Sequence, residues 1–322
     1  MFIFTKPHRL FKRKPDKKAQ VVLDQLDNFL KDSTPQLVEL LYRTFQDQQA
    51  AISYKELREA ALDGYEKEIQ QWQEDYAVFV NEKLKPMWLQ AMKTAADKLK
   101  EKYEGFAFLD SEKEVQEWLS SHGAEFVTNI GESTRQAIKN ILYMGQNEGW
   151  SNGKMAKMIR PCIGLTKGDA AANARYQQSV FDSYMKAHPK ANPEKVAQRA
   201  HEAALKYAAR QHRARAENIA NTEMAFAYNR GYHEGVRQAM RQGFMGTVVK
   251  VWSTAGSERV CKHCSALNGK VVGFEENFDI KGRELYRGMH QTPPAHPSCR
   301  CAIQYREIAP PATMVAGRQE EQ

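Results

Sequence analysis

The sequence predicts an α+β protein that is predominantly helical and ends in a small, β-rich cysteine module of the zinc-knuckle type. Three observations lead to this prediction. Up to residue 245, apolar side chains recur mostly at three- and four-residue steps, the period of an amphipathic helix. From residue 246, short runs rich in β-branched and aromatic residues alternate with turn residues. Four of the five cysteines lie between residues 261 and 301.

Composition bounds the class of protein. With 322 residues, 42% of them hydrophobic and 27% charged, the chain suits a soluble globular protein of roughly two domains. The mean hydropathy is −0.66, and no apolar run approaches the ~20 residues needed to span a bilayer. The N-terminus lacks the apolar stretch of a signal peptide, so we expect synthesis in the cytoplasm and no membrane partner.

Shifts in composition divide the chain into five expected segments. Part of the net charge of +8 lies in an N-terminal arm, where the basic residues face only Asp16. Such an arm either contacts phosphates or stays solvated. Its basic residues are Lys6, Arg9, Lys12, Arg13, Lys14, Lys17 and Lys18. The segments are 1–20, a basic flexible arm; 21–109, a helical N-terminal domain; 110–245, a second helical segment; 246–308, the β-rich cysteine module; and 309–322, a disordered tail.

The N-terminal domain shows two proline signals. Thr34 followed by Pro35 is typical of a helix N-cap with proline at the first helical position. A longer helical pattern from about Tyr54 to Tyr103 contains Pro86, which should break or kink it and give two antiparallel or angled pieces. One buried stripe is expected along this pattern: Leu62, Tyr65, Ile69, Trp72, Tyr76, Phe79 and Val80.

The second helical segment has recognisable ends. Ser111 and Glu114 have the spacing of a capping box, and the helical pattern that follows should end near Gly149. A turn-rich connection follows, in which Cys162 is expected to be a buried apolar residue. Asn192 then begins a helix that runs nearly to Gly243.

Three strands are predicted in the cysteine module. The runs TVVKVW and CAIQYREI are two of them, and both are rich in β-branched and aromatic residues. In ALNGKVVGF, Asn268 and Gly269 stand between apolar residues, which predicts a two-residue hairpin turn.

The paired cysteines are candidate metal ligands. A tight turn lets a C-x-x-C pair such as Cys261 and Cys264 place both sulfurs on one face of a metal ion. Cys299 and Cys301 are two residues apart and would project to the same face of an extended strand. We therefore expect a structural Zn²⁺ held by four thiolates, with His296 as an alternative ligand. Four protein ligands leave no open position for catalysis.

Two alternatives to a metal stay open at these cysteines. The pairs would form disulfides after release from the cell, or they would stay unliganded thiols. The reducing cytoplasm favours the metal, because thiols stay reduced there.

Three stretches in the last third of the chain share an order of short motifs: IANTEMAFAYNRGYHEG, VWSTAGSERVCKHCSALNGKVV and PPAHPSCRC. The series Thr-Glu, Asn-x-Gly, Arg-Val-Cys-x-x-Cys, Leu-Asn-Gly and Pro-Pro-x-His-Pro-x-Cys-Arg-Cys is specific as a whole. It resembles the C-terminal domain of phage head morphogenesis proteins, the Mu F-like minor head proteins. The resemblance is close over residues 217–305 and looser over 125–308.

The resemblance also covers individual residues. The family's cysteine and histidine positions correspond to the five candidate metal ligands. The chain departs from the family at Asn221, where an arginine is usual, and at Ser257, where an acidic residue is often found and only Glu258 follows. These departures put in doubt an ion pair with a partner. The family's helical motif corresponds to Thr222, Glu223, Asn229 and Gly231.

This resemblance implies a bacteriophage virion component that is made with the capsid shell. Such a minor capsid protein associates with the portal vertex and acts in capsid assembly, DNA packaging or DNA ejection. The implied partners are the phage portal protein and, beyond it, scaffold or major capsid protein. The implied location is inside the head or at the portal vertex, after a stay in the host cytoplasm during assembly. The helical N-terminal half is the part expected to meet the portal.

No catalytic residues are predicted, and the protein is not expected to be an enzyme. The chain has no P-loop, GxSxG or HExxH motif. Glu223 would need a second acid or base, and His233 and Glu234 have no hydrolase spacing relative to it. We expect Glu223 to be either a buried residue paired with Arg259 or a polar residue at the surface.

The alternative function is a DNA-binding or nuclease-like phage protein. A basic cluster formed by Arg210, Arg213 and Arg215, with Lys206 one turn before, is suited to non-specific contact with phosphates. A solvated helix face is the simpler interpretation of the same residues.

Overall fold

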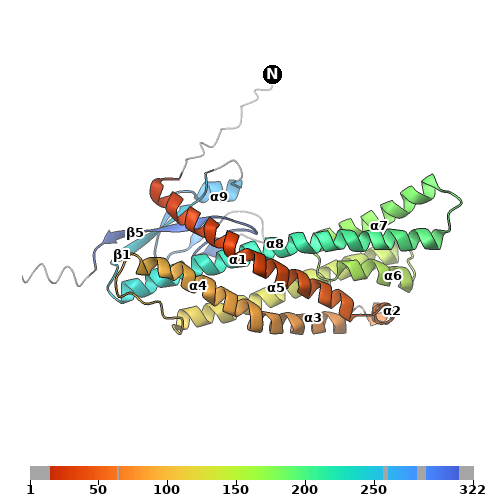
Figure 1. The fold of residues 1–322 in the computed structure, drawn as a ribbon, viewed down its shortest axis with the longest axis horizontal. Helices are drawn as coiled ribbons and strands as arrows, with labels where there is room; N and C mark the ends of the chain where they lie inside the picture. The colour runs from red at the N-terminus through yellow and green to blue at the C-terminus, as the bar shows by residue number, and fades with distance from the viewer. Residues whose placement is uncertain (1–14, 64, 257–259, 281–287, 312–322) are drawn as a thin grey trace, which may run out of the picture. The chain divides into compact units, whose positions relative to one another are not determined.

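The computed structural model describes residues 15–63, 65–256, 260–280 and 288–311. Most of the basic arm and the tail, together with Ser257, Glu258 and Arg259, lie outside the described residues. The α+β class with a mainly helical content is confirmed (Figure 1). The elements are α1 Lys17–Ala51, α2 Tyr54–Asp63, α3 Glu66–Phe79, η1 Val80–Leu84, α4 Lys85–Lys100, α5 Lys113–Asn147, α6 Asn152–Ile159, η2 Arg160–Cys162, α7 Lys167–Ala187, α8 Pro193–Arg241, β1 Thr247–Ser253, α9 Lys262–Leu267, β2 Val271–Gly273, β3 Phe278–Ile280, β4 Gly288–His290 and β5 Ala302–Ala309.

Two compact units share the chain, and neither is continuous in sequence. We call them the sheet unit and the helical unit. The five segments expected from composition describe regions of the sequence and do not correspond to these compact units. They therefore stay a prediction. The sheet unit comprises Met1–Ser33, Trp88–Val115 and Asn221–Gln322, and the helical unit comprises Thr34–Met87 and Gln116–Ala220.

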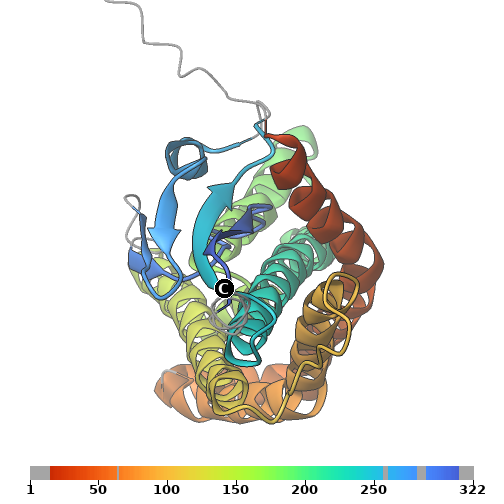
Figure 2. The same cartoon turned by 90° about the vertical axis from the view of Figure 1, so that its left-hand side faces the viewer.

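The sheet unit contains a three-stranded antiparallel sheet in the order β2-β1-β5 and a two-stranded pair of β3 and β4. The predicted strands at TVVKVW and CAIQYREI are confirmed as β1 and β5. Figure 2 shows these strands beside the C-terminal part of α8 and the first turns of α1. Trp252, Phe278 and Ile303 are buried in the core of the sheet unit together with Cys264, Cys299 and Cys301, and the partly buried Cys261 packs against this core.

The hairpin predicted at Asn268–Gly269 is wrong in part. Residues 262–267 form helix α9 rather than a strand, and Gly269, at a φ of 79°, lies in the turn that follows. Its N–H donates to the carbonyl of Trp252 at 2.8 Å, and the turn therefore still places β2 beside β1 in the sheet. The apolar residues before Asn268 are compatible with a strand or with a helix, and the tight turn at Cys261 and Cys264 favours the helix.

The predicted N-cap at Thr34–Pro35 is also wrong, because α1 runs through both residues. The apolar stripe of this helix continues across the proline, with Leu30, Leu37 and Leu41 at most 1% exposed. Burial of this stripe outweighs the backbone bond that proline cannot make. The helix begins at Lys17, inside the segment expected to be a flexible arm.

Pro86 does not split the next helical region into separate pieces. Helical structure is continuous from Glu66 to Lys100, and a π-helical turn at Val80–Leu84 precedes the proline. In this turn the Lys85 N–H donates to the Val80 carbonyl, an i to i+5 bond. This turn changes the backbone hydrogen bonds of the helix from four to five residues apart immediately before Pro86, which has no N–H to donate.

Helix ends in the second half follow local signals with two exceptions. Asn192 caps α8 by accepting from the Glu194 N–H at 2.8 Å, and α5 ends before Gly149, as predicted. The capping box at Ser111 does not start α5, which begins at Lys113. Helix α7 was not predicted, although Thr166 caps it by accepting from the Asp169 N–H.

Helix α8 supports the turn at residues 163–164 within the helical unit. The imidazole of His212 donates to the Ile163 carbonyl at 2.8 Å, and Arg215 donates to the carbonyl of Gly164. Cys162 beside this turn is fully buried, as predicted. Arg215 therefore binds the protein's own backbone and does not belong to an exposed basic face, which corrects that part of the predicted cluster.

Helices α4 and α8 approach each other closely at Gly231 in the sheet unit. A Cβ atom at this position would lie 2.1 Å from the Cα of Met92 and 2.5 Å from its carbonyl oxygen. Both are backbone atoms, so a side-chain rotation cannot relieve the contact. The glycine of the family's helical motif is therefore required by helix packing.

Replacing Gly231 by alanine should lower the free energy of unfolding by at least about 2 kcal/mol, because the two helix backbones must separate. Gly153→Ala is the matched control: it lies in helix α6, and a Cβ atom there would meet no heavy atom within 4 Å. Alanine there should be neutral or stabilising by up to about 1 kcal/mol. Urea denaturation of both variants measures the difference, and equal stabilities would contradict the close approach.

Candidate functional site: a cysteine and histidine cluster

The four clustered cysteines and His296 form two overlapping groups of possible metal ligands in the sheet unit. One group is Cys261, Cys264 and His296, and the other is Cys264, Cys299 and Cys301. Within each group the candidate ligand atoms lie within 4.8 Å of one another. Cys264, Cys299 and Cys301 are buried, whereas Cys261 is partly exposed. The cluster thus brings together every metal ligand predicted from the sequence.

A tight turn at the start of α9 positions the first cysteine pair. Cys261 is the N-cap of this helix, and its sulfur accepts from the Cys264 N–H at 3.3 Å. The Ser265 N–H donates to the Cys261 carbonyl at 2.9 Å and closes the turn. The predicted knuckle at C-x-x-C is present in this form.

Distances among the donor atoms suit a tetrahedral ion. The Nε2 atom of His296 lies 3.2 Å from the sulfurs of both Cys261 and Cys264, and the sulfurs of Cys264 and Cys299 are 3.7 Å apart. Zn–S bonds of about 2.3 Å and Zn–N bonds of about 2.0 Å at tetrahedral angles require about 3.5 Å between nitrogen and sulfur and about 3.8 Å between two sulfurs. The three observed distances differ from these values by at most a few tenths of an ångström, and each group of three donors is able to hold a metal.

Charge in the cluster favours a cation bound by thiolates. The neighbouring Cys299 raises the pKa of His296 to about 9, and hydrogen bonds from Cys264 and Cys301 hold the pKa of Cys299 well below its usual value. Negative charge is therefore held on Cys299, whereas the neighbouring cysteines raise the pKa of Cys264 and of Cys301. A metal cation lowers the pKa of the thiols that bind it, so a bound ion would stabilise the thiolate form of these cysteines.

The helical motif of α8 binds the backbone of the second cysteine pair. The hydroxyl of Thr222 accepts from the Ser298 N–H at 2.8 Å. The side-chain amide of Asn229 donates to the Cys301 carbonyl at 3.3 Å. These contacts explain why the motif residues and the cysteines occur together in one sequence pattern. Glu223 of the same motif is buried, and its expected partner Arg259 lies outside the described residues.

A buried group of charged side chains was not foreseen from the sequence. The carboxylate of Glu234 is 1% exposed and lies 2.6 Å from Arg230 and 3.1 Å from Arg237. Lys250 of β1 is fully buried, and its ammonium donates to the carbonyls of Glu276 at 2.6 Å and Gln291 at 3.1 Å. Burial lowers the pKa of Lys250 to about 8. Spacings of four and three residues on α8 were the available signal for the arginine pairs.

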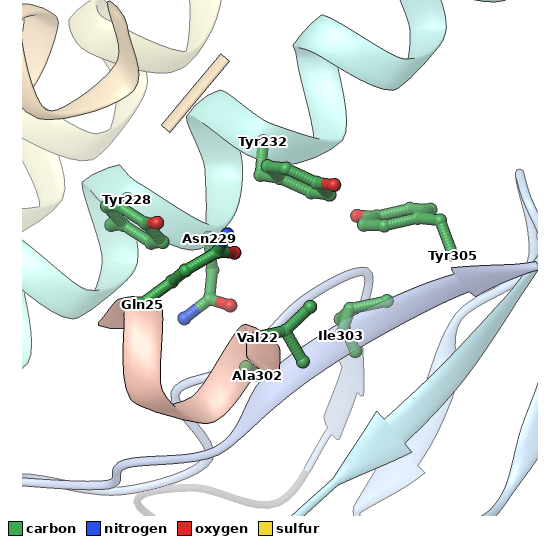
Figure 3. A pocket seen from close by; sticks show the side chains of 8 residues that line it. All are labelled: Val22, Gln25, Tyr228, Asn229, Tyr232, Ala302, Ile303 and Tyr305. Carbon is green, nitrogen blue, oxygen red and sulfur yellow. The ribbon is translucent and has the colours of Figure 1, made fainter. Parts of the chain in front are cut away.

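A small hollow nearby offers no chemistry of its own (Figure 3). It lies between α1, α8 and β5, and the hydroxyl groups of Tyr232 and Tyr305 point toward each other across it. Among the described residues, its lining contains no carboxylate, imidazole or thiol. The lining residues are Val22, Gln25, Tyr228, Asn229, Tyr232, Ala302, Ile303 and Tyr305.

A family model described as phage Mu protein F like protein matches residues 136–304, which are 169 of the 322 residues. The chain belongs to the phage Mu protein F-like family. The resemblance to head morphogenesis proteins is thereby confirmed. No curated protein and no solved structure matches the chain.

Membership in this family relates the protein to phage head morphogenesis and implies a location in the virion. The family is one of structural head proteins, which agrees with the expectation that the chain is not an enzyme. In the part of the chain that the structure describes, no helix is both long enough and apolar enough to cross a bilayer.

Replacing Thr222 by valine should remove the acceptor of the Ser298 N–H and cost about 1–2 kcal/mol of unfolding free energy. Thr222→Ser keeps the hydroxyl and should stay within about 0.5 kcal/mol of the parent chain. Chemical denaturation of the two variants in parallel measures this difference. If valine were as stable as serine, Thr222 would not support the cysteine turn.

Proposed function

We propose that this protein is a minor head protein at the portal vertex, where it acts in procapsid assembly, DNA packaging or DNA ejection. The family match carries the proposal, because it covers residues 136–304 and includes the cysteine cluster with its supporting helix. The portal protein is the proposed main partner, and scaffold or major capsid protein are further ones. Assembly would take place in the host cytoplasm.

The helices before residue 136 are the proposed portal-binding part. They lie outside the family match and include the long amphipathic helix α1. Two of their valines are conspicuously exposed: Val21 of α1 is 54% exposed and Val78 of α3 is 55% exposed. Exposed apolar side chains on stable helices are suitable contacts for a protein partner.

Co-expression with the portal protein of the same phage, without other head proteins, tests this proposal. We expect the two chains to co-elute at moderate salt. Val21→Asp and Val78→Asp should reduce the amount of bound chain, because a charge replaces an apolar contact. Val271→Asp is the matched control: it changes a valine of β2 that is 53% exposed and should not affect co-elution.

Other outcomes of this experiment are equally informative. No co-elution, with the chain still present in procapsids, would transfer the partner role to scaffold, shell or DNA. Absence from particles altogether would contradict the head-protein proposal.

We further propose that the cysteine cluster holds one structural Zn²⁺. Donor distances near those of a tetrahedral site support this, as does the mixed cysteine and histidine donor set. The ion would cross-link α9 to the segment before β5. A small sheet of short strands gains stability from such a link, because its own apolar core is limited.

Non-specific contact with DNA is a second proposed function, supported by a basic stripe on α8. The stripe consists of five exposed bases at intervals of four, seven, four and three residues, which place them along one face of the helix. Its two ends are 18 residues apart, or about 27 Å along the helix. Its members are Lys195, Arg199, Lys206, Arg210 and Arg213.

The charges of the stripe are only partly balanced within the helical unit. Arg213 lies 3.4 Å from Glu39, and Glu202 interrupts the stripe on the same face. Arg199 and Arg210 instead lie over the rings of Tyr184 and Tyr207, at 5.0 and 5.6 Å. A cation held over an aromatic ring keeps its positive charge and hydrogen-bond donors for a phosphate.

Binding to duplex DNA should weaken with salt, because each neutralised phosphate adds about 0.9 to the slope of log affinity against log salt. Arg199→Gln combined with Lys206→Gln should reduce that slope by about 1.8. The control double variant, Lys67→Gln with Lys139→Gln, removes the same charge from exposed positions outside the stripe. If the stripe variant and the control variant had equal slopes, DNA binding would depend on the net charge of the protein and not on the stripe.

The same preparations decide the nuclease-like alternative. Cleavage of DNA that depends on a divalent metal would contradict the non-enzymatic proposal.

A further inference from the structure

The region around His296 contains a second turn with the same spacing of candidate ligands as the cysteine knuckle. The Cys299 N–H donates to the His296 carbonyl at 3.1 Å, and Ser298 has a φ of 54°. His296 and Cys299 therefore stand at the two ends of an H-x-x-C turn. The knuckle at Cys261 and Cys264 has the same spacing and is likewise braced across its ends. Each turn presents two donor atoms.

The side chain of His296 has the orientation of a metal-ligating histidine. Its Nδ1 atom lies 2.9 Å from the carbonyl oxygen of Pro297, which can only accept, so Nδ1 carries the proton. Nε2 faces the sulfurs of Cys261 and Cys264, each 3.2 Å away, and is the nitrogen that a metal would bind after displacing its proton. A backbone carbonyl that binds one ring nitrogen and leaves the other for a metal is the usual arrangement at metal-bound histidines.

Cys301 is fixed differently from the other four donors. Its carbonyl accepts from Asn229, and the next residue, Ala302, pairs with Ser253 in the sheet. Cys301 thus belongs to the start of β5 rather than to either turn. Its sulfur lies within 4.8 Å of the sulfurs of Cys264 and Cys299, and a hydrogen bond joins its side chain to that of Cys299.

We propose that one Zn²⁺ is held by the two turns, through Cys261, Cys264, His296 and Cys299, and that Cys301 supports the bound sulfurs as a neutral thiol. This assignment rests on the proposed zinc centre and replaces the four-thiolate set expected from spacing. Zn²⁺ in a closed site takes four ligands, and two turns of equal spacing supply them. The set also carries one negative charge less than four thiolates, which eases its burial.

Cobalt substitution in the full chain tests the ligand set. The chain is purified under reducing conditions, its zinc content is measured, and the metal-free protein is titrated with Co²⁺. We expect about one metal per chain and the visible bands of a tetrahedral site. The sulfur-to-cobalt charge-transfer absorption, which grows with the number of Co–S bonds, should correspond to three thiolates.

Two variants separate the possible ligand sets without removing a ligand position. His296→Cys should keep Co²⁺ binding and add the absorption of a fourth thiolate. Cys301→Ser should leave the absorption unchanged and weaken Co²⁺ binding by less than about 10-fold. Cys299→Ser is the matched control, since it removes a ligand next to Cys301, and should weaken binding by more than about 100-fold.

The results that overturn the assignment differ from those that overturn the zinc centre. Loss of one thiolate's absorption in Cys301→Ser, with no gain in His296→Cys, would establish the four-cysteine set and refute ours. Wild-type protein that contains no zinc and binds no Co²⁺ would refute the zinc centre itself.

Discussion

The sheet unit depends on α8, which must satisfy two backbones at once on opposite faces of the helix. At Gly231 this helix has no room for a Cβ atom against the backbone of Met92. Less than three turns earlier, Thr222 holds the Ser298 N–H, and Asn229 holds the carbonyl of Cys301. Because a helix is stiff, fixing it against α4 also fixes where these hydrogen bonds can form. The cysteine cluster is therefore positioned from α8 as much as from its own short strands.

Local signals in the sequence were enough for those elements that local chemistry decides. The cap at Asn192, the helix end before Gly149 and the strands β1 and β5 all follow from residue type and spacing. Pro35 shows where such reasoning stops, because the stripe that outweighs it becomes visible only when α1 is packed. The missed helix α7 had a usable signal in Thr166 and Asp169, but the glycines beside them suggested a turn.

For the site, spacing predicted which residues gather but not how they are held. Short spacing keeps the two cysteines of each pair close together, and the fold then brings the two pairs side by side. The pairs are Cys261 with Cys264 and Cys299 with Cys301. The role of His296 depends on which ring nitrogen faces the sulfurs, and only the Pro297 carbonyl decides that. Similarly, Arg215 and Arg213 are two residues apart on α8, so they point in different directions. One binds the carbonyl of Gly164, and the other remains at the surface.

The buried charges give the segment between β2 and β5 a second attachment. Replacing a buried ion pair by apolar residues often preserves stability, so Glu234 and its arginines are weak arguments for stability alone. Lys250 is different, because its ammonium binds two backbone carbonyls, at Glu276 and Gln291, that are far apart in sequence. The proposed metal would bind the same segment a few residues later, at His296 and Cys299. A long connection with short strands thus obtains its conformation from directional polar contacts at two points, where an apolar core of this size would leave several arrangements of similar energy.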